Sequence, residues 1–197
     1  MKFIIGKKIE MSQMFDEKGT LTPVTLVAAG PVTVLQKKTK EKEGYDAVQF
    51  GFEKLEKKSK IKKTMNGKEY RHVRELRGGA EGNVGDQVTV EAFKPGDVVT
   101  VIGVSKGKGF QGAVRRHGFH GRDQTHGMKH DARTLGSIGH RFPQHTIKGQ
   151  RMHGRMGADR VTVKNLTVAK IDVANNIIAL KGAVPGHRGT LLQIKGN

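Results

Sequence analysis

The sequence predicts a mainly β protein whose body is interrupted by a long basic segment of irregular structure. Short runs rich in β-branched residues recur at close spacing between turn-forming residues. Hydrophobic residues make up only 35% of the 197 residues and aromatic residues 5%, so part of the chain is expected to lack a core of its own. Positive charge and glycine are concentrated in one stretch of the second half.

The first half of the chain contains most of the predicted strands. The turn-forming pair Gly30-Pro31 separates the first two strands, and Lys94-Pro-Gly-Asp97 suits a type II turn before the last one. The lysine-rich residues 53–68 are compatible with a short helix or an exposed loop. The predicted strands are residues 24–27, 32–35, 45–50, 69–76, 87–93 and 98–102.

The strand pattern resumes after the basic segment, in residues 161–163, 168–173 and 177–180. Asn175-Asn176 tolerate positive φ and predict a hairpin turn between the last two. Short strands at this spacing are typical of a small barrel or a sandwich.

We therefore expect one domain with a large insertion. Residues 1–102 form the first part of the body, with a smaller inserted subdomain at about 45–76, and residues 161–197 supply its final strands. Residues 103–160 form an extended basic loop between them.

The charge distribution separates this loop from the body. The chain has 36 Lys and Arg against 18 Asp and Glu, a net charge of +18. Residues 104–164 contain 13 basic and 3 acidic residues, a net of +10, together with seven of the nine histidines. Such an excess repels itself unless a polyanion neutralises it. Nucleic acid is the usual partner, anionic membrane is the minor alternative, and we expect the loop to take its shape from that partner.

The cysteine content and the hydropathy indicate in which cellular compartment the protein resides. The absence of cysteine excludes disulfides and thiolate metal sites, which fits a reducing compartment. The N-terminal apolar run is too short for a signal peptide, and no stretch approaches the ~20 apolar residues of a spanning helix. We expect a soluble, cytoplasmic protein with no membrane contact.

The glycines Gly107, Gly109 and Gly112 follow a predicted strand with the G-x-G-x-x-G spacing of a dinucleotide-binding turn. Such a site also needs a helix after the third glycine and a second parallel strand. Here Gly118 stops the helix within two turns, and no apolar strand precedes Asp131. We expect no cofactor, because glycines among cations suit close approach of the backbone to phosphate groups.

Histidine spacing raises a metal hypothesis. His126 and His130 lie four residues apart, and His117 and His120 lie three apart. No carboxylate lies between His126 and His130, and neighbouring cations would repel a metal ion, so no metal site is expected. Neutral imidazoles that stack on bases or bond to phosphate and 2′-hydroxyl groups explain these histidines more simply.

No group of residues in the loop suggests catalysis. The chain has no cysteine nucleophile, and Ser105 and Ser137 lack the context of a nucleophile elbow. The three acidic residues of the loop are far apart in sequence: Asp123, Asp131 and Asp159. We therefore expect a protein that is not an enzyme and has no small-molecule substrate.

Several motifs, in order along the chain, match one known family. They are residues 105–112 followed by Arg116, residues 125–127, 136–139, 152–157 and 160–163, the N-terminal residues 6–8 with Met11 and Phe15, and the C-terminal residues 182–186. Together they resemble the universal large-subunit ribosomal protein L-three family. The resemblance covers nearly the whole chain.

The resemblance implies a β-barrel of the translation-protein type with an extension that penetrates large-subunit (23S) rRNA. It implies a structural constituent of the large ribosomal subunit that binds this rRNA directly and early in assembly, near its 3′ end. The extension would reach toward the peptidyl-transferase centre, and the partners would be rRNA and neighbouring large-subunit proteins. Bacterial members of the family carry a methylated glutamine shortly after the Gly-Ser-Ile-Gly motif. Gln144 is the nearest glutamine here, in a segment one residue shorter than in the family.

Two rival functions stay open on the residues alone: a free-standing basic binder of DNA or other polyanions, and an NAD(P)-dependent oxidoreductase that uses residues 107–112. On the favoured interpretation, cations contact phosphate, and glutamine and histidine side chains bond to bases, ribose or phosphate. The expected RNA-binding residues are Lys106, Lys108, Gln111, Arg115, Arg116, His117, Arg122, His126, Lys129, His130, Arg133, His140, Arg141, Gln144, His145, Lys148, Arg151, Arg155 and Arg160.

Overall fold

The computed structural model describes residues 2–16, 19–78 and 83–196. The chain divides into two compact units. We call Met1–Val104 with Arg160–Asn197 the strand unit, and Ser105–Asp159 the inserted unit.

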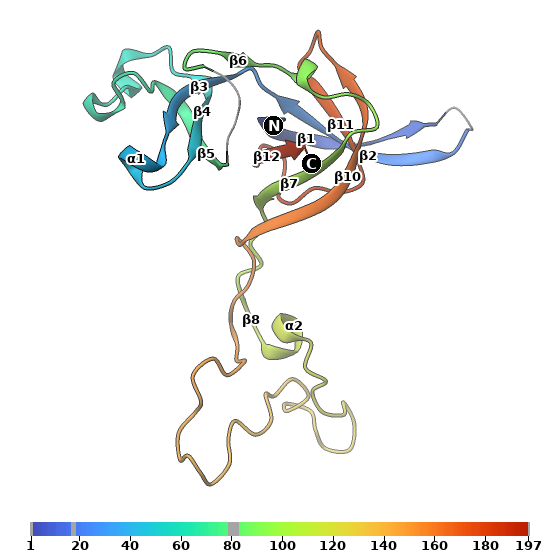
Figure 1. Cartoon of the computed structure of the whole chain (residues 1–197). Coiled ribbons are helices and arrows are strands. Elements are labelled where there is room, and N and C mark those ends of the chain that lie inside the picture. The colour runs from blue at the N-terminus through green and yellow to red at the C-terminus, as the bar shows by residue number, and fades with distance from the viewer. Residues whose placement is uncertain (1, 17–18, 79–82, 197) are drawn as a thin grey trace. The chain divides into compact units, whose positions relative to one another are not determined.

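Six strands of the strand unit form an antiparallel sheet that closes on itself (Figure 1). Their order is β1-β12-β7-β10-β11-β2, and β2 pairs back to β1. The strands are β1 (Phe3–Phe15), β2 (Leu21–Ala29), β7 (Val98–Val104), β10 (Arg160–Asp172), β11 (Ile177–Lys181) and β12 (Leu191–Gly196).

A second antiparallel sheet has the strand order β5-β4-β3-β6. Its core is continuous with that of the closed sheet, because the rings of Phe3 and Phe50 lie 4.8 Å apart between their centroids. Its strands are β3 (Val32–Lys38), β4 (Ala47–Lys54), β5 (Tyr70–Arg77) and β6 (Gln87–Val88). Short helical turns connect them: α1 (Lys40–Glu43), η1 (Lys58–Lys60), η2 (Lys63–Met65) and, after β6, η3 (Val90–Ala92).

The core of the closed sheet follows from the period of two along β7 and β12. Alternate residues of these strands are buried, and Leu192 and Ile194 are fully covered. In β1 the consecutive residues Phe3, Ile4 and Ile5 are all buried, because the second sheet also packs there through Phe50. Successive side chains of a strand point to opposite faces, so alternate apolar residues fill the interior of a closed sheet. The expectation of a mainly β protein is confirmed.

Two of the predicted turns are confirmed in detail. Gly96 has φ +87°, and the Asp97 amide donates to the Lys94 carbonyl over 3.1 Å, as a type II turn requires. Asn176 has φ +54° and closes the hairpin between β10 and β11.

Two strand predictions need correction. Residues 87–93 were expected to be one strand, but only Gln87–Val88 is extended and η3 follows. That turn places Val90 fully in the core, which outweighs the β propensity of the run. Residues 161–163 and 168–172 belong to the single strand β10, and Val173 already lies in the turn after it. Asn165, at φ +59°, lies in an irregularity of β10 between Val163 and Leu166. The sequence pattern did not reveal β1 or β12.

Truncation of a core leucine gives a first test of this packing. Leu192 is fully buried, and a Cβ on Gly103 would come within 2.7 Å of it. We expect Leu192→Ala to lower the free energy of unfolding by about 2–5 kcal/mol, because the cavity cannot close around a rigid sheet. Urea denaturation measures it. The matched change Leu21→Ala, at a side chain that is 51% exposed, should cost clearly less; equal losses would contradict the assigned core.

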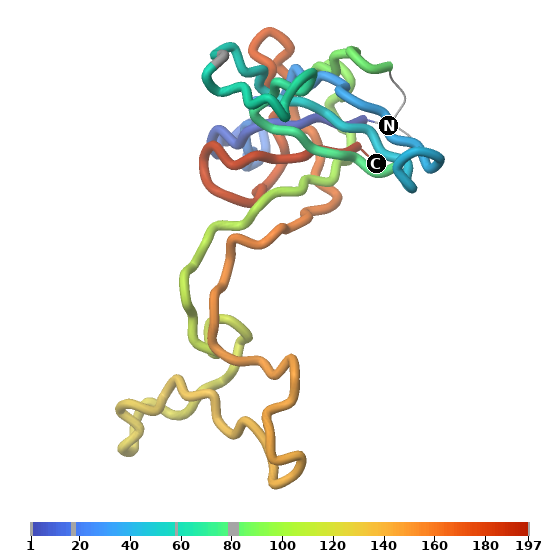
Figure 2. The backbone as a smooth tube through the Cα atoms, turned by 90° about the vertical axis from the view of Figure 1, so that its left-hand side faces the viewer, coloured from blue at the N-terminus to red at the C-terminus, as the bar shows by residue number. Residues whose placement is uncertain are grey.

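The inserted unit has little regular structure (Figure 2). It contains the two-stranded pair β8 (Phe110–Gln111) and β9 (Gly154–Arg155), and the helix α2 (Ala113–His117). Gly118 ends α2 at φ +72°, as the sequence predicted. No helix in the described part of the chain is long and apolar enough to span a membrane.

Candidate nucleic-acid interface

The inserted unit begins as two antiparallel legs. The Ser105 amide donates to the Asp159 carbonyl over 2.9 Å. Farther along, the Lys108 amide donates to the Met156 carbonyl, and the Met156 amide donates to the Gly109 carbonyl, both over 2.9 Å. Figure 2 shows the two legs side by side before the chain opens into loops. The legs bring residues about fifty positions apart in sequence into register.

Gly157 permits this close approach. Its φ is +77°, and a Cβ at this position would lie 2.2 Å from the Lys106 carbonyl oxygen. That oxygen is backbone, so it cannot turn aside as a side chain could. Glycine is therefore required at this position for two reasons: its backbone has a positive φ, and a side chain would have no room.

A matched pair of variants separates these two requirements. Gly149 has φ +84°, and a Cβ added there would meet no atom within 4 Å, so Gly149→Ala adds only the left-handed strain of about 1–2 kcal/mol. We expect Gly157→Ala to add a clash of about 1–3 kcal/mol to the same strain. In cells that make tagged copies, the Gly157→Ala protein should be at least several-fold less abundant at steady state than the Gly149→Ala protein. Equal abundance would contradict the close approach of the legs.

Helix α2 is fastened to the second leg by two side chains. The Arg116 guanidinium donates from Nη1 to the Met152 carbonyl over 2.9 Å, and His117 Nε2 lies 3.1 Å from the same oxygen. A Cβ on Gly154 would come within 2.7 Å of Arg116 Nη1. The sequence predicted that Arg116 and His117 bind RNA. In the structure both side chains also hold α2 to the second leg, because both contact the Met152 carbonyl.

The other predicted side chains point mostly into solvent. Gln111, Arg116 and His117 are half-buried. Gln111 donates to the Lys108 carbonyl and accepts from Arg115 Nη1 over 3.2 Å. The exposed residues are Lys106, Lys108, Arg115, Arg122, His126, Lys129, His130, Arg133, His140, Arg141, Gln144, His145, Lys148, Arg151, Arg155 and Arg160.

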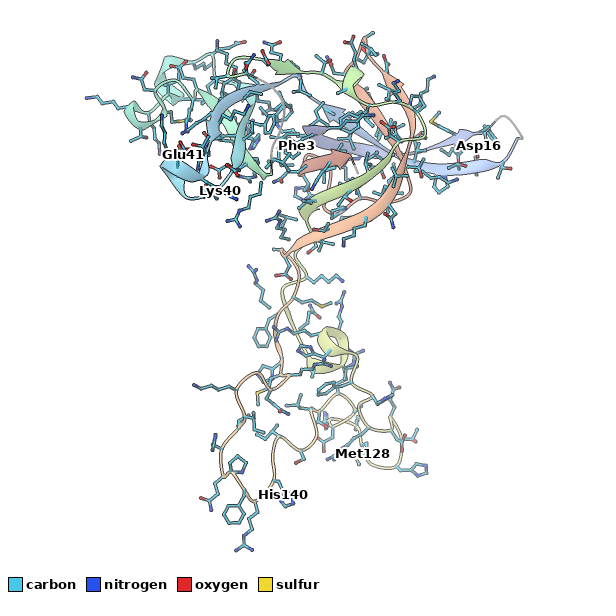
Figure 3. The ribbon with its side chains drawn as sticks, viewed as in Figure 1. Phe3, Asp16, Lys40, Glu41, Met128 and His140 are labelled. Carbon is cyan, nitrogen blue, oxygen red and sulfur yellow. The ribbon has the colours of Figure 1, made fainter. Side chains whose placement is uncertain are left out.

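Two of these residues have particular surroundings. Arg160 begins β10 and pairs with Val104, so it belongs to the strand unit. Gln144 has φ +58° at the exposed end of a loop. Figure 3 shows the His140 side chain at the outer end of the inserted unit, where it is exposed.

Exposed apolar side chains in this unit were not predicted as site residues. Phe110 is 71% exposed and 5.4 Å from the His153 ring, and Phe142 is 69% exposed with the Arg141 guanidinium 5.7 Å from its ring centre. Ile138 and Ile147 are exposed as well. The sequence signal that could have identified Phe110 and Phe142 is an isolated aromatic residue between glycines and cations. Such rings can stack on bases.

The glycine motif does not form a dinucleotide site. The strand before it, β7, is antiparallel to both of its neighbours, and every strand pair in the described residues is antiparallel. Helix α2 after Gly112 has only five residues. A dinucleotide fold needs a parallel crossover and a full helix behind the third glycine. This geometry argues against the oxidoreductase alternative.

Across residues 2–16, 19–78 and 83–196, no three His, Asp or Glu side chains come together as a metal site would require. An ion pair in the inserted unit joins Arg155 to Asp159, whose charged atoms lie 3.9 Å apart and whose side chains are both about 70% exposed. Such a pair adds little stability.

A dense polar cluster lies in the second sheet. Glu75 accepts from Lys38 Nζ at 2.6 Å, from the Tyr45 hydroxyl at 3.0 Å and from Gln49 Nε2 at 3.1 Å. The hydrogen bond from Lys38 is the main reason why the pKa of Glu75 falls below its usual value, and that bond likewise raises the pKa of Lys38. A carboxylate held in its charged form by three donors suits a structural role.

The inserted unit as a whole is cationic and has almost no interior. It contains eleven Lys and Arg against three Asp, a net charge of +8. Among its residues only Ala113 and Gly157 are buried. Its surface is therefore positive, glycine-rich and open.

The fold and this surface define the class: a mainly β, strongly basic protein that carries a cationic insertion almost without a core. A family model described as "Ribosomal protein L3" matches residues 65–175. The chain belongs to the ribosomal protein L3 family.

Curated relatives cover almost the full length. Each of the following is a large ribosomal subunit protein uL3. The protein of Carboxydothermus hydrogenoformans is 43% identical over 98% of this chain and 96% of its own. That of Finegoldia magna is 44% identical over 99% and 97%, and that of Trichlorobacter lovleyi is 46% identical over 98% and 96%.

Proposed function

We propose that the protein is a structural, non-enzymatic constituent of the large ribosomal subunit and binds large-subunit (23S) rRNA directly through its inserted unit. One observation carries the proposal beyond family membership: the inserted unit has a net charge of +8 and only two buried residues. Such a unit gains its stability by neutralising phosphate charge, because it has no core to supply it.

The contacts follow from the side chains that the unit presents. Exposed Lys and Arg side chains would bind phosphate oxygens, with the planar arginine fork also able to stack on bases. Exposed His and Gln side chains would bond to ribose and base edges. We propose the nineteen residues named above as the RNA-binding set: eighteen lie in the inserted unit, and Arg160 lies at its border in the strand unit. Arg116 and His117 also hold the inserted unit together.

The family supports a finer proposal. The closed sheet would be a translation-protein barrel on the subunit, and the inserted unit would be an extension directed toward the peptidyl-transferase centre. Binding would occur early in assembly, near the 3′ end of the rRNA, beside other large-subunit proteins in the cytoplasm. Residues 1–102 and 161–197 would then form the body, and residues 103–160 the RNA-binding loop.

Gln144 is the proposed site of glutamine methylation. Its exposure and its position in a loop leave the side-chain amide accessible to an enzyme. Peptide mass spectrometry of protein from purified subunits would show an added methyl group on the peptide that contains Gln144. An unmodified peptide would contradict this assignment.

The direct test of the proposed function is cosedimentation. We expect the endogenous protein to remain with large subunits after a high-salt wash. In a parallel competition at physiological salt, large-subunit rRNA fragments should displace the protein from duplex DNA. Equal affinity for both nucleic acids, with release from subunits by the wash, would favour a free-standing basic binder. Saturable binding of NAD or NADP in equilibrium dialysis would favour the oxidoreductase alternative.

A further inference from the structure

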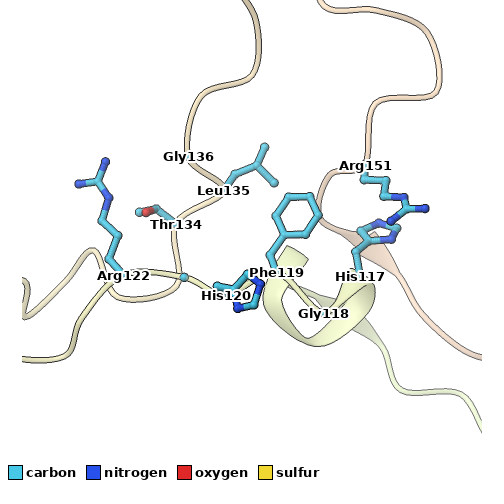
Figure 4. A pocket seen from close by; sticks show the side chains of 10 residues that line it. His117, Gly118, Phe119, His120, Arg122, Thr134, Leu135, Gly136 and Arg151 are labelled. Carbon is cyan, nitrogen blue, oxygen red and sulfur yellow. The ribbon is translucent and has the colours of Figure 1, made fainter.

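A hollow of about 460 Å³ lies within the inserted unit, beside the end of α2. Figure 4 shows it from close by. Three segments far apart in sequence line it: residues 117–122, residues 134–136 and Arg151. Half of the residues that line it are exposed, so the hollow is open to solvent.

Backbone contacts hold the three segments together. Gly121 has φ +76°, and a Cβ there would lie 2.4 Å from the Ala132 carbonyl oxygen. The same oxygen accepts from the Arg122 amide over 2.9 Å. The third segment is tied by the Met152 carbonyl, which lies 3.1 Å from His117 Nε2. The hollow is thus built by specific contacts between the segments.

Two apolar side chains line the hollow. Figure 4 shows the Phe119 ring and the Leu135 side chain near one another, on separate segments. Both are half-buried, and neither belongs to the core of the strand unit. An aromatic face and an aliphatic side chain that line one hollow suit a flat, apolar ligand ring.

The rim of the hollow is cationic. Arg122 and Arg151 line it from different segments, and the side chain of His120 also lies there. Of the described residues that line the hollow, none is acidic. A flat ring with an attached anion therefore fits both the interior and the rim.

We propose that this hollow binds one unstacked nucleotide of a chain, with its base against Phe119 and Leu135 and the phosphates on either side of it beside Arg122 and Arg151, which lie on opposite sides of the hollow. The inference rests on the proposed RNA-binding function and specifies one contact within it. A free mononucleotide has the same chemistry as a nucleotide of an RNA chain. The RNA chain is favoured because exposed cations continue beyond the hollow, where a single phosphate could not reach them.

The test uses the full chain with two matched variants. Phe119→Leu keeps an apolar side chain but removes the stacking face, and Phe142→Leu removes an exposed ring of the same unit outside the hollow. Each variant is assembled into large subunits in cells, and every rRNA base is probed with base-reactive reagents. A further variant, Leu135→Gln, removes the second apolar side chain of the hollow and guards against a folding defect peculiar to Phe119→Leu.

We expect one and the same base to become reactive in Phe119→Leu and Leu135→Gln subunits and to stay protected in Phe142→Leu subunits. On an rRNA fragment, Phe119→Leu should weaken binding by about 5- to 150-fold, the effect of losing one stacked base. Ultraviolet crosslinking of wild-type subunits should join that nucleotide to the peptide containing Phe119.

The possible failures are distinct. Normal incorporation of Phe119→Leu without any newly reactive base would overturn the nucleotide site and leave the ribosomal function intact. Failure of the wild-type protein to enter subunits would overturn the proposed function itself. Saturable binding of AMP or UMP to the RNA-free protein, lost in Phe119→Leu, would assign the hollow to a free mononucleotide and overturn the RNA source.

Discussion

A chain in which Asn-Gly replaces residues 106–158 is expected to fold as a closed sheet and to be absent from washed large subunits. The design follows the register of the structure, in which Val104 pairs with Arg160 and the Ser105 amide bonds to the Asp159 carbonyl over 2.9 Å. Ser105 and Asp159 can therefore flank a two-residue hairpin turn, for which Asn-Gly is the strongest sequence signal.

The body should survive this deletion because its core contains no residue of the inserted unit. The continuous core cluster consists of residues of the strand unit alone. The deletion removes eleven basic and two acidic residues, so its main effect is the loss of phosphate-binding charge. Circular dichroism and urea denaturation would check the fold, and quantitative mass spectrometry of washed subunits would check incorporation.

Two results would contradict this expectation. Wild-type incorporation of the shortened chain would mean that the strand unit supplies the main RNA-binding surface. An unfolded product would mean that the strand unit depends on the insertion. The Leu192→Ala variant serves as a control for simple loss of stability, because it weakens the body and leaves every cation in place.

Neutralising four exposed cations of the inserted unit is expected to change the salt dependence of RNA binding strongly. In the variant, Lys129, Arg133, Arg141 and Lys148 become Gln, and all four side chains are exposed. Each phosphate contact contributes about 0.7 to 0.9 to the slope of log K against log salt concentration, so the slope should become shallower by roughly 3. The slope is measured from the binding of an rRNA fragment between about 50 and 200 mM salt. In this range about ten phosphate contacts change the affinity by up to ~10⁵-fold.

The control carries the same change in charge on the strand unit. Lys37, Lys42, Lys57 and Lys60, also exposed, become Gln. If net charge alone governed binding, both variants would lose the same slope. If the inserted unit is the interface, the control should keep most of the wild-type slope. If the slope were shallower in the control than in the first variant, the main RNA-binding surface would lie on the strand unit, which would contradict the proposal.

Local features of the fold followed from the sequence where neighbouring residues decide them. Proline fixes its φ as the first central residue of a type II turn requires. Gly96 has the positive φ that the second central residue needs, and Asn176 accepts the positive φ of a hairpin. Strands β2, β3, β7 and β11 contain the β-branched runs that predicted them. The strand β1 was not predicted because Gly6-Lys-Lys8 interrupts its apolar run, and its partners supply the stabilisation instead.

Some features of the candidate interface also followed from the sequence, and others depended on contacts between distant residues. Exposure of most cations follows from composition, since a glycine- and arginine-rich segment has too few apolar residues to cover them. The double role of Arg116 does not, because its acceptor is the carbonyl of Met152, 36 positions away. The sequence did not distinguish Gly157 from the other glycines of the segment. Its requirement for glycine comes from the Lys106 carbonyl of the opposite leg, which a Cβ would meet.

By itself the sequence determined the β character of the body, its turns and the concentration of charge, because these depend on residues a few positions apart. Only the tertiary structure decided between a closed ring and a sandwich, since closure requires β1 to pair with β12 at the other end of the chain and with β2. It also decided that Phe119 and Leu135 line the same hollow. Contacts between distant segments depend on how loops close and backbones meet, and no local pattern of residue types encodes that geometry.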